Sequence, residues 1–255
     1  MEQLRNIIQS SDSLANGLRI NGSQHQNYKM YTSMERALGT LISGYIYLSN
    51  GNTWNDVPDH YFMETKNAFA TCFSCSTKEN IAMWMLYGAE HGKNGAMLNF
   101  YPSVLKELMN SEIVEMGAFD HHKQFTVQHI LKRSKKDFEI FLSDVVYVDE
   151  CKNGKFRLTC GDEHVIAEGM ILDHRDIFIK NYAWSYEKEC RLIVRPSQKW
   201  YAKSSREHLS AVRLKLSSQS IRKMQDGRLI RSPIYSGGVS FGIPSALTDD
   251  VSWEL

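Results

Sequence analysis

The stretch from residue 184 to residue 195 constrains the fold most, because charged side chains there run directly into an apolar segment. Residues 192–194 are Leu, Ile and Val, which favour a β-strand. Alternate residues of a strand share one face, so Glu187, Glu189 and Arg191 are expected to project together. Two neighbouring carboxylates repel each other, and Arg191 supplies a cation beside them. The row predicts either a binding site or a charged edge strand that avoids edge-to-edge pairing.

Composition places the chain among ordinary globular proteins. It has 255 residues, of which 42% are hydrophobic and 23% are charged. The formal net charge is +1, so no global field marks a nucleic-acid or membrane-surface protein. No segment approaches the roughly 18 apolar residues of a membrane-spanning helix. The five cysteines are scattered and odd in number, which favours reduced thiols and predicts a cytoplasmic protein.

The chain divides into a polar beginning and a longer segment of alternating helices and strands. Residues 1–27 are rich in Ser, Asn and Gln, and we interpret them as a flexible N-terminal arm. Residues 28–255 contain frequent short loops and hairpin signals. The sequence therefore predicts one α+β domain, with a mixed, largely antiparallel sheet flanked by helices.

Local signals place several elements. A cap at Thr32 or Ser33 and a stop at Gly44 predict a helix, and Asn153-Gly154 predicts a β-hairpin turn. Ser76-x-x-Glu79 resembles a capping box and predicts a helix from 79 to 89. Hydrophobic spacing predicts two further helices, over residues 123–142 and 170–183.

Several catalytic signatures are absent from the sequence. It has no phosphate-binding loop, no Rossmann glycine fingerprint and no His-Glu-x-x-His motif. Cys72-x-x-Cys75 has a metal-like spacing, but the two thiols straddle a predicted strand end and no second Cys/His pair follows. We therefore expect no bound metal.

Polar side chains remain at the ends of three predicted strands. Tyr31 ends the first, Ser74 and Ser76 end the second, and Glu187 and Glu189 belong to the third. Each has a purely structural interpretation as well: Ser76 can cap a helix, and a Glu and an Arg can form a cross-strand ion pair.

Motifs in a fixed order resemble a bacterial family, the domain-of-unknown-function family twenty-nine seventy-one, which includes AbiGi-type abortive-infection proteins. The resemblance covers about residues 28–195, and it implies a role in phage defence. Val57 separates Asp56 from Pro58, where the family usually runs Asn-Asp-Pro. The motifs are Tyr28-Lys29-Met30-Tyr31, Trp54-Asn55-Asp56, Cys72-Phe73-Ser74, Met83-Trp84-x-x-Tyr87-Gly88, and Lys180-x-x-x-Trp184-x-Tyr186-Glu187-x-Glu189-x-Arg191.

A weaker similarity links the chain to ADP-ribosyltransferases of the Arg-Ser-Glu type, through Ser74-Cys75-Ser76 and Glu187-Lys188-Glu189. The similarity implies NAD as substrate. A carboxylate can stabilise the positive charge that builds on ribose as the nicotinamide bond breaks. The first strand carries Lys29 where the family has an Arg.

The leading hypothesis is an NAD-using, ADP-ribosyltransferase-like effector in antiphage defence, with an unknown macromolecular acceptor or phage component as partner. Two alternatives stay open. One is a metal-dependent nuclease or phosphodiesterase that uses Asp56, Glu187 and Glu189 around a divalent ion, with Lys180 nearby. The other is a non-catalytic sensor or antitoxin-like protein. A homo-oligomer or a partner protein is also left open. The expected catalytic residues are Glu189 and Glu187, and the expected nucleotide-binding residues are Tyr31, Trp54, Ser74, Ser76 and Arg191.

Overall fold

The computed structural model describes most of the chain between residues 25 and 231. The chain folds into two compact units, each assembled from segments that are separate in the sequence. The described parts of 48–72 and 112–213 belong to the first unit, and those of 23–47, 73–111 and 214–231 belong to the second. The described residues are 25–50, 68–88, 95–148, 150–152, 155–160, 163–170, 179–200, 209–226 and 230–231.

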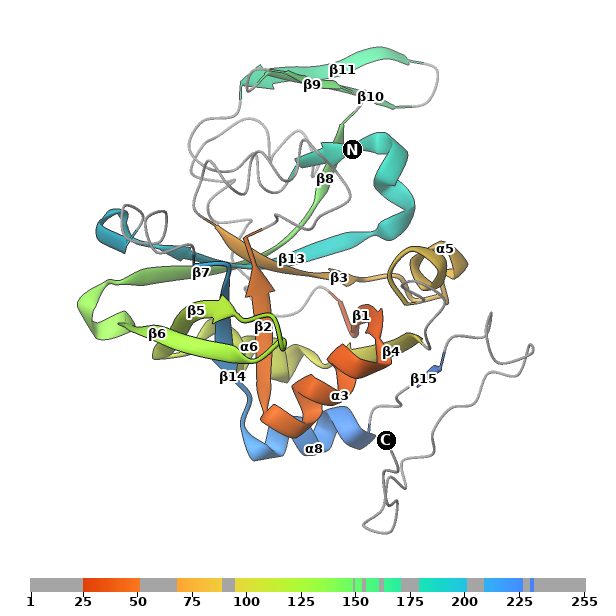
Figure 1. Ribbon diagram of the computed structural model, residues 1–255. Coiled ribbons are helices and arrows are strands. Elements are labelled where there is room, and N and C mark those ends of the chain that lie inside the picture. Colours follow the sequence, from red (N-terminus) through yellow and green to blue (C-terminus); the bar gives the residue numbers. More distant parts are fainter. Residues whose placement is uncertain are drawn as a thin grey trace. The chain divides into compact units, whose positions relative to one another are not determined.

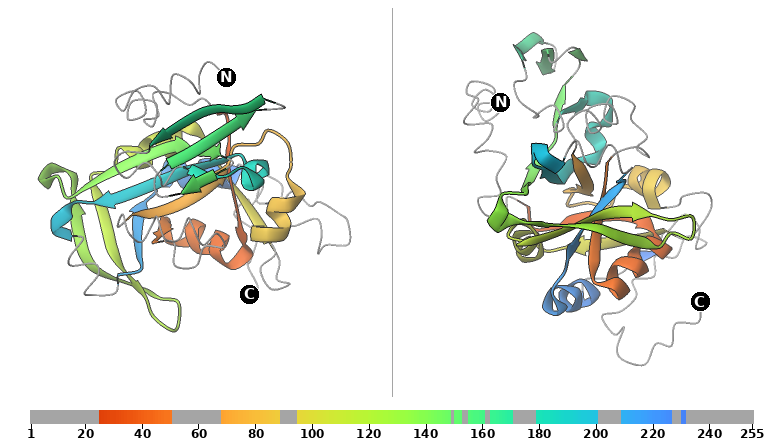
Figure 2. Two further views of the ribbon diagram at one scale, coloured as in Figure 1. Left: turned by 90° about the horizontal axis from the view of Figure 1, so that it is seen from above. Right: turned by 60° about the vertical axis from the view of Figure 1, so that its left-hand side comes forward.

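The first unit consists mainly of antiparallel strands (Figure 1). Strand β13 pairs with β7 from Cys190 opposite Asp144 to Pro196 opposite Phe138. Figure 2 shows β5 and β6 as a long hairpin, and β14 pairs with the other edge of β5. The strands are β5 (Ile113–Phe119), β6 (Phe125–Lys132), β7 (Phe138–Asp144), β8 (Val146–Val148), β9 (Glu150–Lys152), β10 (Lys155–Cys160), β11 (Glu163–Met170), β12 (Ile179–Asn181) and β13 (Glu189–Pro196).

Two smaller groups of strands complete the first unit. Strands β9, β10 and β11 form an antiparallel group, while β8 and β12 pair in parallel. Lys152 lies opposite Lys155, which confirms the hairpin predicted at Asn153-Gly154. The short 3-10 helices η3 (Arg133–Lys135) and η5 (Tyr182–Glu187) precede β7 and β13. The predicted mixed, largely antiparallel α+β arrangement is confirmed.

Strand β13 lies in the core of the first unit. Leu192, Ile193 and Val194 are all buried, so side chains on both faces of this strand are shielded from water. Burying a side chain of this size stabilises a fold by about 1.5–3 kcal/mol. A strand buried on both faces gives rigid support to the polar residues that begin it.

The second unit combines β-strands with the main α-helices. Helix α3 has Ser33 as its N-cap and Gly44 as its left-handed C-cap, as predicted. Strand β1 pairs with β4, and Tyr28, Phe73 and Phe100 pack edge to face in the core. Its elements are β1 (Tyr28–Ser33), α3 (Met34–Ser43), α5 (Ile81–Met83), the π-helix η1 (Trp84–Gly88), β4 (Gly95–Phe100), α6 (Pro102–Met109), α8 (Ser218–Asp226) and β15 (Ile230–Arg231).

Three strands cross the boundary between the units along the chain: β2 (Tyr45–Ser49), β3 (Phe69–Ser74) and β14 (Ala211–Lys215). None of the described helices is both long and apolar enough to cross a membrane. Residues 1–24 lie outside the described residues, so the flexible arm stays a prediction, as does the single domain from residue 28.

The helix predicted over residues 123–142 is wrong. Residues 123–142 form strands β6 and β7, joined by a tight turn in which Lys136 has a positive φ of 52°. Most of the helix predicted over 170–183 lies outside the described residues, because 171–178 are not described. At its ends β11 stops at Met170 and β12 occupies 179–181, so the helix does not include these positions. The apolar residues of β6 and β7 were compatible with helical spacing, and strand pairing overrode that local pattern.

Candidate functional site

Four charged side chains meet inside the first unit, and we call them the charge cluster: Lys180, Glu187, Glu189 and Arg191. Lys180 comes from β12, Glu187 ends η5, and the other two belong to β13. The exposed fractions of the four residues lie between 0% and 7%. The cluster is therefore almost closed to solvent, which is unusual for four ionisable groups.

The two carboxylates converge by a turn rather than by strand alternation. Glu187 is the last residue of a 3-10 helix, so its predicted place on the strand is wrong. Lys188 then adopts a left-handed conformation with φ of 46°, and Glu189 begins β13. This single left-handed residue redirects the chain between the two acids, and their oxygens reach the same ammonium group.

Lys180 bridges the two acids. Its Nζ lies 2.7 Å from Oε2 of Glu187 and 3.2 Å from Oε2 of Glu189. The same Nζ lies 4.8 Å from the ring centroid of Trp184, close enough for a cation–π interaction. Burial alone would lower the pKa of Lys180, but the negative charges of the two glutamates outweigh it and raise the pKa above its ordinary value. Lys180 is therefore charged at neutral pH.

Arg191 holds Glu189 with two hydrogen bonds. Its Nε donates to Oε1 over 2.8 Å and its Nη2 donates to Oε2 over 3.2 Å. Such paired contacts fix a carboxylate in orientation as well as in charge. Burial would raise the pKa of Glu189, but Arg191 and Lys180 hold it at about 2. Glu189 therefore stays ionised although it is buried.

Two neutral groups also contact Glu189. The Glu189 backbone N–H donates a hydrogen bond of 2.8 Å to the hydroxyl of Tyr147 on β8. The thiol of Cys72 on β3 donates to the Glu189 carboxylate. Burial raises the pKa of this thiol well above its ordinary value, and the charge of Glu189 raises it further. Cys72 is thus a protonated hydrogen-bond donor and a poor nucleophile.

Sequence reasoning found only part of this site. It identified Glu187, Glu189 and Arg191, which the structure brings together. It placed Lys180 near the two acids in the nuclease alternative, but it did not predict the direct ion pairs of Lys180 with both of them. Nothing in the sequence singled out Tyr147, because strand pairing brings this residue to Glu189.

The predicted nucleotide-binding residues lie in several parts of the chain. Tyr31, Ser74 and Ser76 belong to the second unit and are buried there. Tyr31 packs edge-on against Trp84, with ring centroids 5.1 Å apart. Trp54 lies outside the described residues, as does Asp56.

The predicted capping box at Ser76 is wrong in its details. The first helical residue after it is Ile81, and the Asn80 side chain caps this helix by accepting from the Met83 N–H. Helix α5 continues as the π-helix η1. The described helical residues are therefore 81–88, where the sequence predicted a helix from 79 to 89. Ser76 therefore does not cap α5, and its role at a nucleotide stays a prediction.

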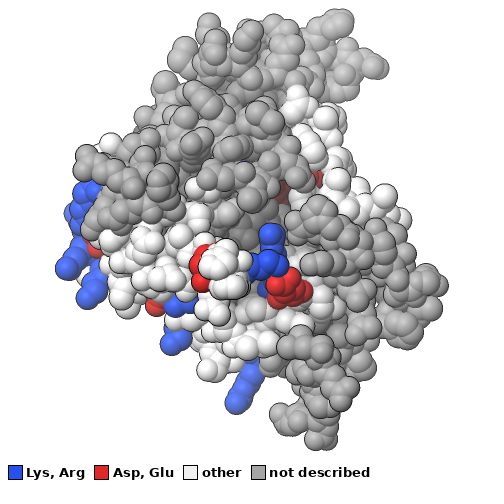
Figure 3. All heavy atoms as spheres, viewed as in Figure 1, with Lys and Arg blue, Asp and Glu red and all other residues white. Residues whose placement is uncertain are grey.

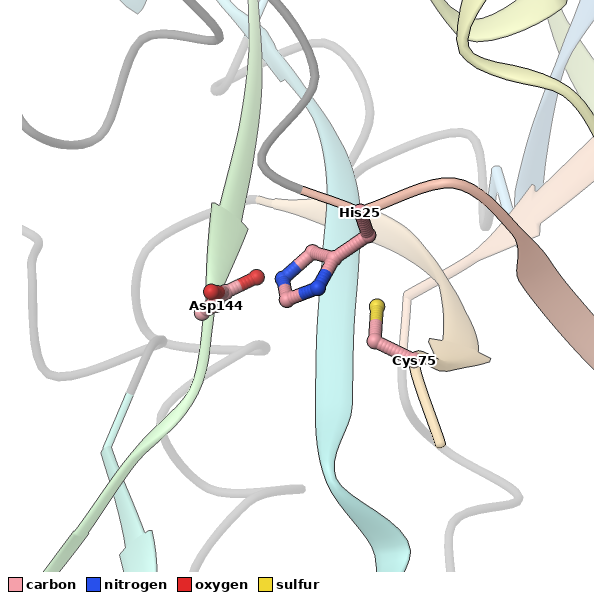
Figure 4. Close-up of side chains that lie close together, drawn as sticks. All are labelled: His25, Cys75 and Asp144. Atoms are coloured by element: carbon pink, nitrogen blue, oxygen red, sulfur yellow. The ribbon is translucent and has the colours of Figure 1, made fainter. Parts of the chain in front are cut away.

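His25 and Cys75 lie close together in the second unit, with their potential ligand atoms within 4.8 Å of each other (Figure 4). A structural zinc site needs four ligands. This pair provides two, and Asp144, also labelled in Figure 4, belongs to the first unit. The pair alone does not define a metal centre.

The charge cluster combines two kinds of group that a nucleotide requires. Two carboxylates and two cations give it no net formal charge. Cations bind phosphate, and carboxylates accept hydrogen bonds from ribose hydroxyls. Aromatic rings lie on the adjoining η5 segment: Tyr182 is 57% exposed and Tyr186 is 36% exposed. Such rings can stack on a base.

Residues 83–192 match the family "Protein of unknown function (DUF2971)". The match confirms the predicted resemblance to this family, and it contains all four residues of the charge cluster. Comparison with curated proteins gave no match, and neither did comparison with solved structures. The similarity to ADP-ribosyltransferases stays a prediction.

Proposed function

We propose that the protein is an ADP-ribosyltransferase-like effector in antiphage defence that binds and cleaves NAD at the charge cluster. The observation that carries the proposal is the buried Glu189 carboxylate, which Arg191 and Lys180 hold in place and whose pKa these two cations lower. Breaking the bond between ribose and nicotinamide builds positive charge on the ribose. A fixed carboxylate in a buried site stabilises such charge strongly.

The cations of the cluster must change partners for this chemistry to occur. In the observed state Lys180 pairs with both acids, and Arg191 pairs with Glu189. The pyrophosphate of NAD is an anion that competes for Lys180, and its binding would release the Glu187 carboxylate toward the ribose hydroxyls. Glu189, still oriented by Arg191, would then face the ribose carbon. The electron pair of the broken bond leaves with nicotinamide, and water or the acceptor's nucleophile takes its place.

Entry of the nucleotide requires movement of η5. The cluster residues are at most 7% exposed, while the same short segment carries the exposed rings of Tyr182 and Tyr186. A 3-10 helix has poorer hydrogen-bond geometry than an α-helix, which makes this segment the easier one to displace. The exposed rings would then stack on the nicotinamide or adenine ring. The role of Ser74 and Ser76 in nucleotide binding stays a prediction from the sequence.

The proposed defence role rests on the resemblance of the sequence motifs to those of AbiGi-type abortive-infection proteins. The nuclease alternative requires both carboxylates to face a divalent cation. In the described residues Lys180 and Arg191 occupy the positions beside them, which favours an anionic ligand over a metal ion.

The test is release of nicotinamide from NAD by the purified full-length protein. Glu189→Gln removes the charge and keeps the size, and we expect a loss of at least about 100-fold. Glu139→Gln is the matched control, because Glu139 pairs with Arg195 on the same ladder of β7 and β13 but is exposed. Unchanged turnover in a folded Glu189→Gln protein rejects the assignment. Absence of both NAD binding and turnover in the wild-type protein rejects the proposed function.

A further inference from the structure

Strand β6 forms an edge of the first unit. It pairs with β5 along its whole length, from Lys132 opposite Ile113 to Phe125 opposite Phe119. Among the described strands β5 is its one neighbour, and β6 stands at the end of the strand order. An edge strand presents backbone hydrogen-bonding groups to which another extended chain can pair.

Strand β6 carries few of the features that protect an edge strand from pairing. Natural edge strands are blunted by charges, proline or bulges. Among the eight residues of β6, Lys132 is the one Lys, Arg, Asp or Glu, and there is no proline. One bulge interrupts the ladder: Met116 pairs with His129 and Gly117 with Val127, so Gln128 is an extra residue of β6. Ile130 is 54% exposed, and Ile113 on the paired strand is 49% exposed.

The turn after β6 is strongly basic. Lys132, Lys135 and Lys136 are exposed, and Arg133 stacks over the ring of Phe138 at 5.3 Å. The acidic neighbour Asp137 is buried, where its carboxylate pairs with Lys199. Figure 3 shows Lys and Arg side chains gathered where β6 turns into β7. The positive charge of the turn therefore exceeds its negative charge.

An extended acidic peptide fits this combination better than other partners do. Strand addition supplies main-chain hydrogen bonds, alternate apolar side chains can contact Ile130, and acidic side chains complement the lysines. Antiparallel pairing of two copies of β6 would set the Lys132 end against the Phe125 end of the other copy, leaving the lysines without acidic partners. Nucleic acid is less suited, because no aromatic residue interleaves the basic run 132–136.

We propose that β6 and its basic turn bind an extended, acidic segment of a partner protein by strand addition. This inference goes beyond the proposed NAD chemistry and uses none of its residues. It provides the effector with a docking surface for a regulator or acceptor that presents such a segment.

Fluorescence anisotropy with the full-length protein tests the proposal. The probe is a labelled peptide of roughly 12 residues that alternates Glu and Val, long enough to span β6. We expect saturable binding that weakens at least tenfold when salt rises from about 50 to about 300 mM. In a second peptide every other Val is replaced by Pro. Proline has no backbone N–H to donate, so this peptide should not bind.

Two variants assign the binding to this surface. The first is a triple variant, which should weaken binding of the Glu-Val peptide at least tenfold. It combines Lys132→Glu, Lys135→Glu and Lys136→Glu. The matched control replaces three exposed lysines of the second unit by glutamate, and it should leave peptide binding unchanged. These lysines are Lys78, Lys106 and Lys215. Ile130→Asp, a change at an exposed side chain, should also weaken binding.

Several results would overturn the proposal. They are no binding of the Glu-Val peptide, equal binding of the Pro-interrupted peptide, and equal losses in the two triple variants. Binding of a single-stranded oligonucleotide without binding of the peptide would also overturn it. The proposal would also be overturned if the protein binds no peptide but forms a dimer in sedimentation experiments, and if Ile130→Asp dissociates that dimer.

Discussion

The guanidinium of Arg191 lies 2.8 Å from the Glu189 carboxylate, at the start of a strand whose apolar residues fill the core of the first unit. Arg191 is fully buried and Glu189 is 5% exposed. Burying two charges is costly, and their mutual attraction offsets this cost only when the geometry is good. A pair of this kind makes predictions about stability that can be separated from those about activity.

Removing the guanidinium should destabilise the fold strongly. Arg191→Met keeps an apolar stem but leaves Glu189 without its main cation, and we expect a loss of about 3–5 kcal/mol in the free energy of unfolding. The control, Arg195→Met, breaks a partly exposed ion pair with Glu139 and should cost at most about 1 kcal/mol. Urea denaturation measures both values, and equal losses would contradict the buried geometry.

The stability of the protein should fall in acid in a way that depends on Glu189. Its folded-state pKa, about 2, lies below its ordinary value of 4.5. A lowered folded pKa gives stability that is complete above pH 4.5 and is lost as the pH falls toward 2. Denaturation at several pH values in this window should show a shallower decline for Glu189→Gln than for Glu139→Gln. The same slope in both variants would argue against an ionised, buried Glu189.

Cys72 should resist alkylation in the folded protein. Burial and the charge of Glu189 both raise the pKa of its thiol, so little thiolate forms near neutral pH. Mass spectrometry after iodoacetamide treatment at pH 8 should find Cys72 modified at least about tenfold faster in denaturant than in buffer. Rapid labelling of Cys72 in the native state would show that the thiol is not held as described.

Tyr147 should support Glu189 through the backbone. Tyr147→Phe removes the acceptor of the Glu189 N–H and should cost about 1–3 kcal/mol in stability. Hydrogen exchange at the Glu189 amide should also become faster. A general packing defect would speed exchange at many positions, so a change confined to Glu189 identifies the lost hydrogen bond. Tyr182→Phe, at an exposed ring, serves as the control and should change neither quantity.

Local signals in the sequence were enough to predict several elements. The Ser33 cap and the Gly44 stop of α3 depend on side chains and backbone within a few residues, so they are visible without tertiary structure. The hairpin between β9 and β10 is equally local. Alternating polarity also indicated that Glu189 and Arg191 would act together.

The remaining features depend on contacts between distant residues. The spacing of Val127, Ile130 and Leu131 suits a helix as well as a strand, and the pairing of β6 with β5 decides between them. The turns at Lys136 and Lys188 use non-glycine residues at positive φ, which leave no clear signal in the sequence. Lys180 reaches the acids because β12 pairs in parallel with β8.

The most direct test of NAD binding at the charge cluster is a crystal structure of the Glu189→Gln protein soaked with NAD. We predict pyrophosphate on Lys180, ribose hydroxyls within hydrogen-bond distance of Glu187, and an aromatic ring of η5 against a base. NAD bound elsewhere, or a cluster that stays closed with Lys180 on Glu187 at saturating NAD, would contradict the proposal.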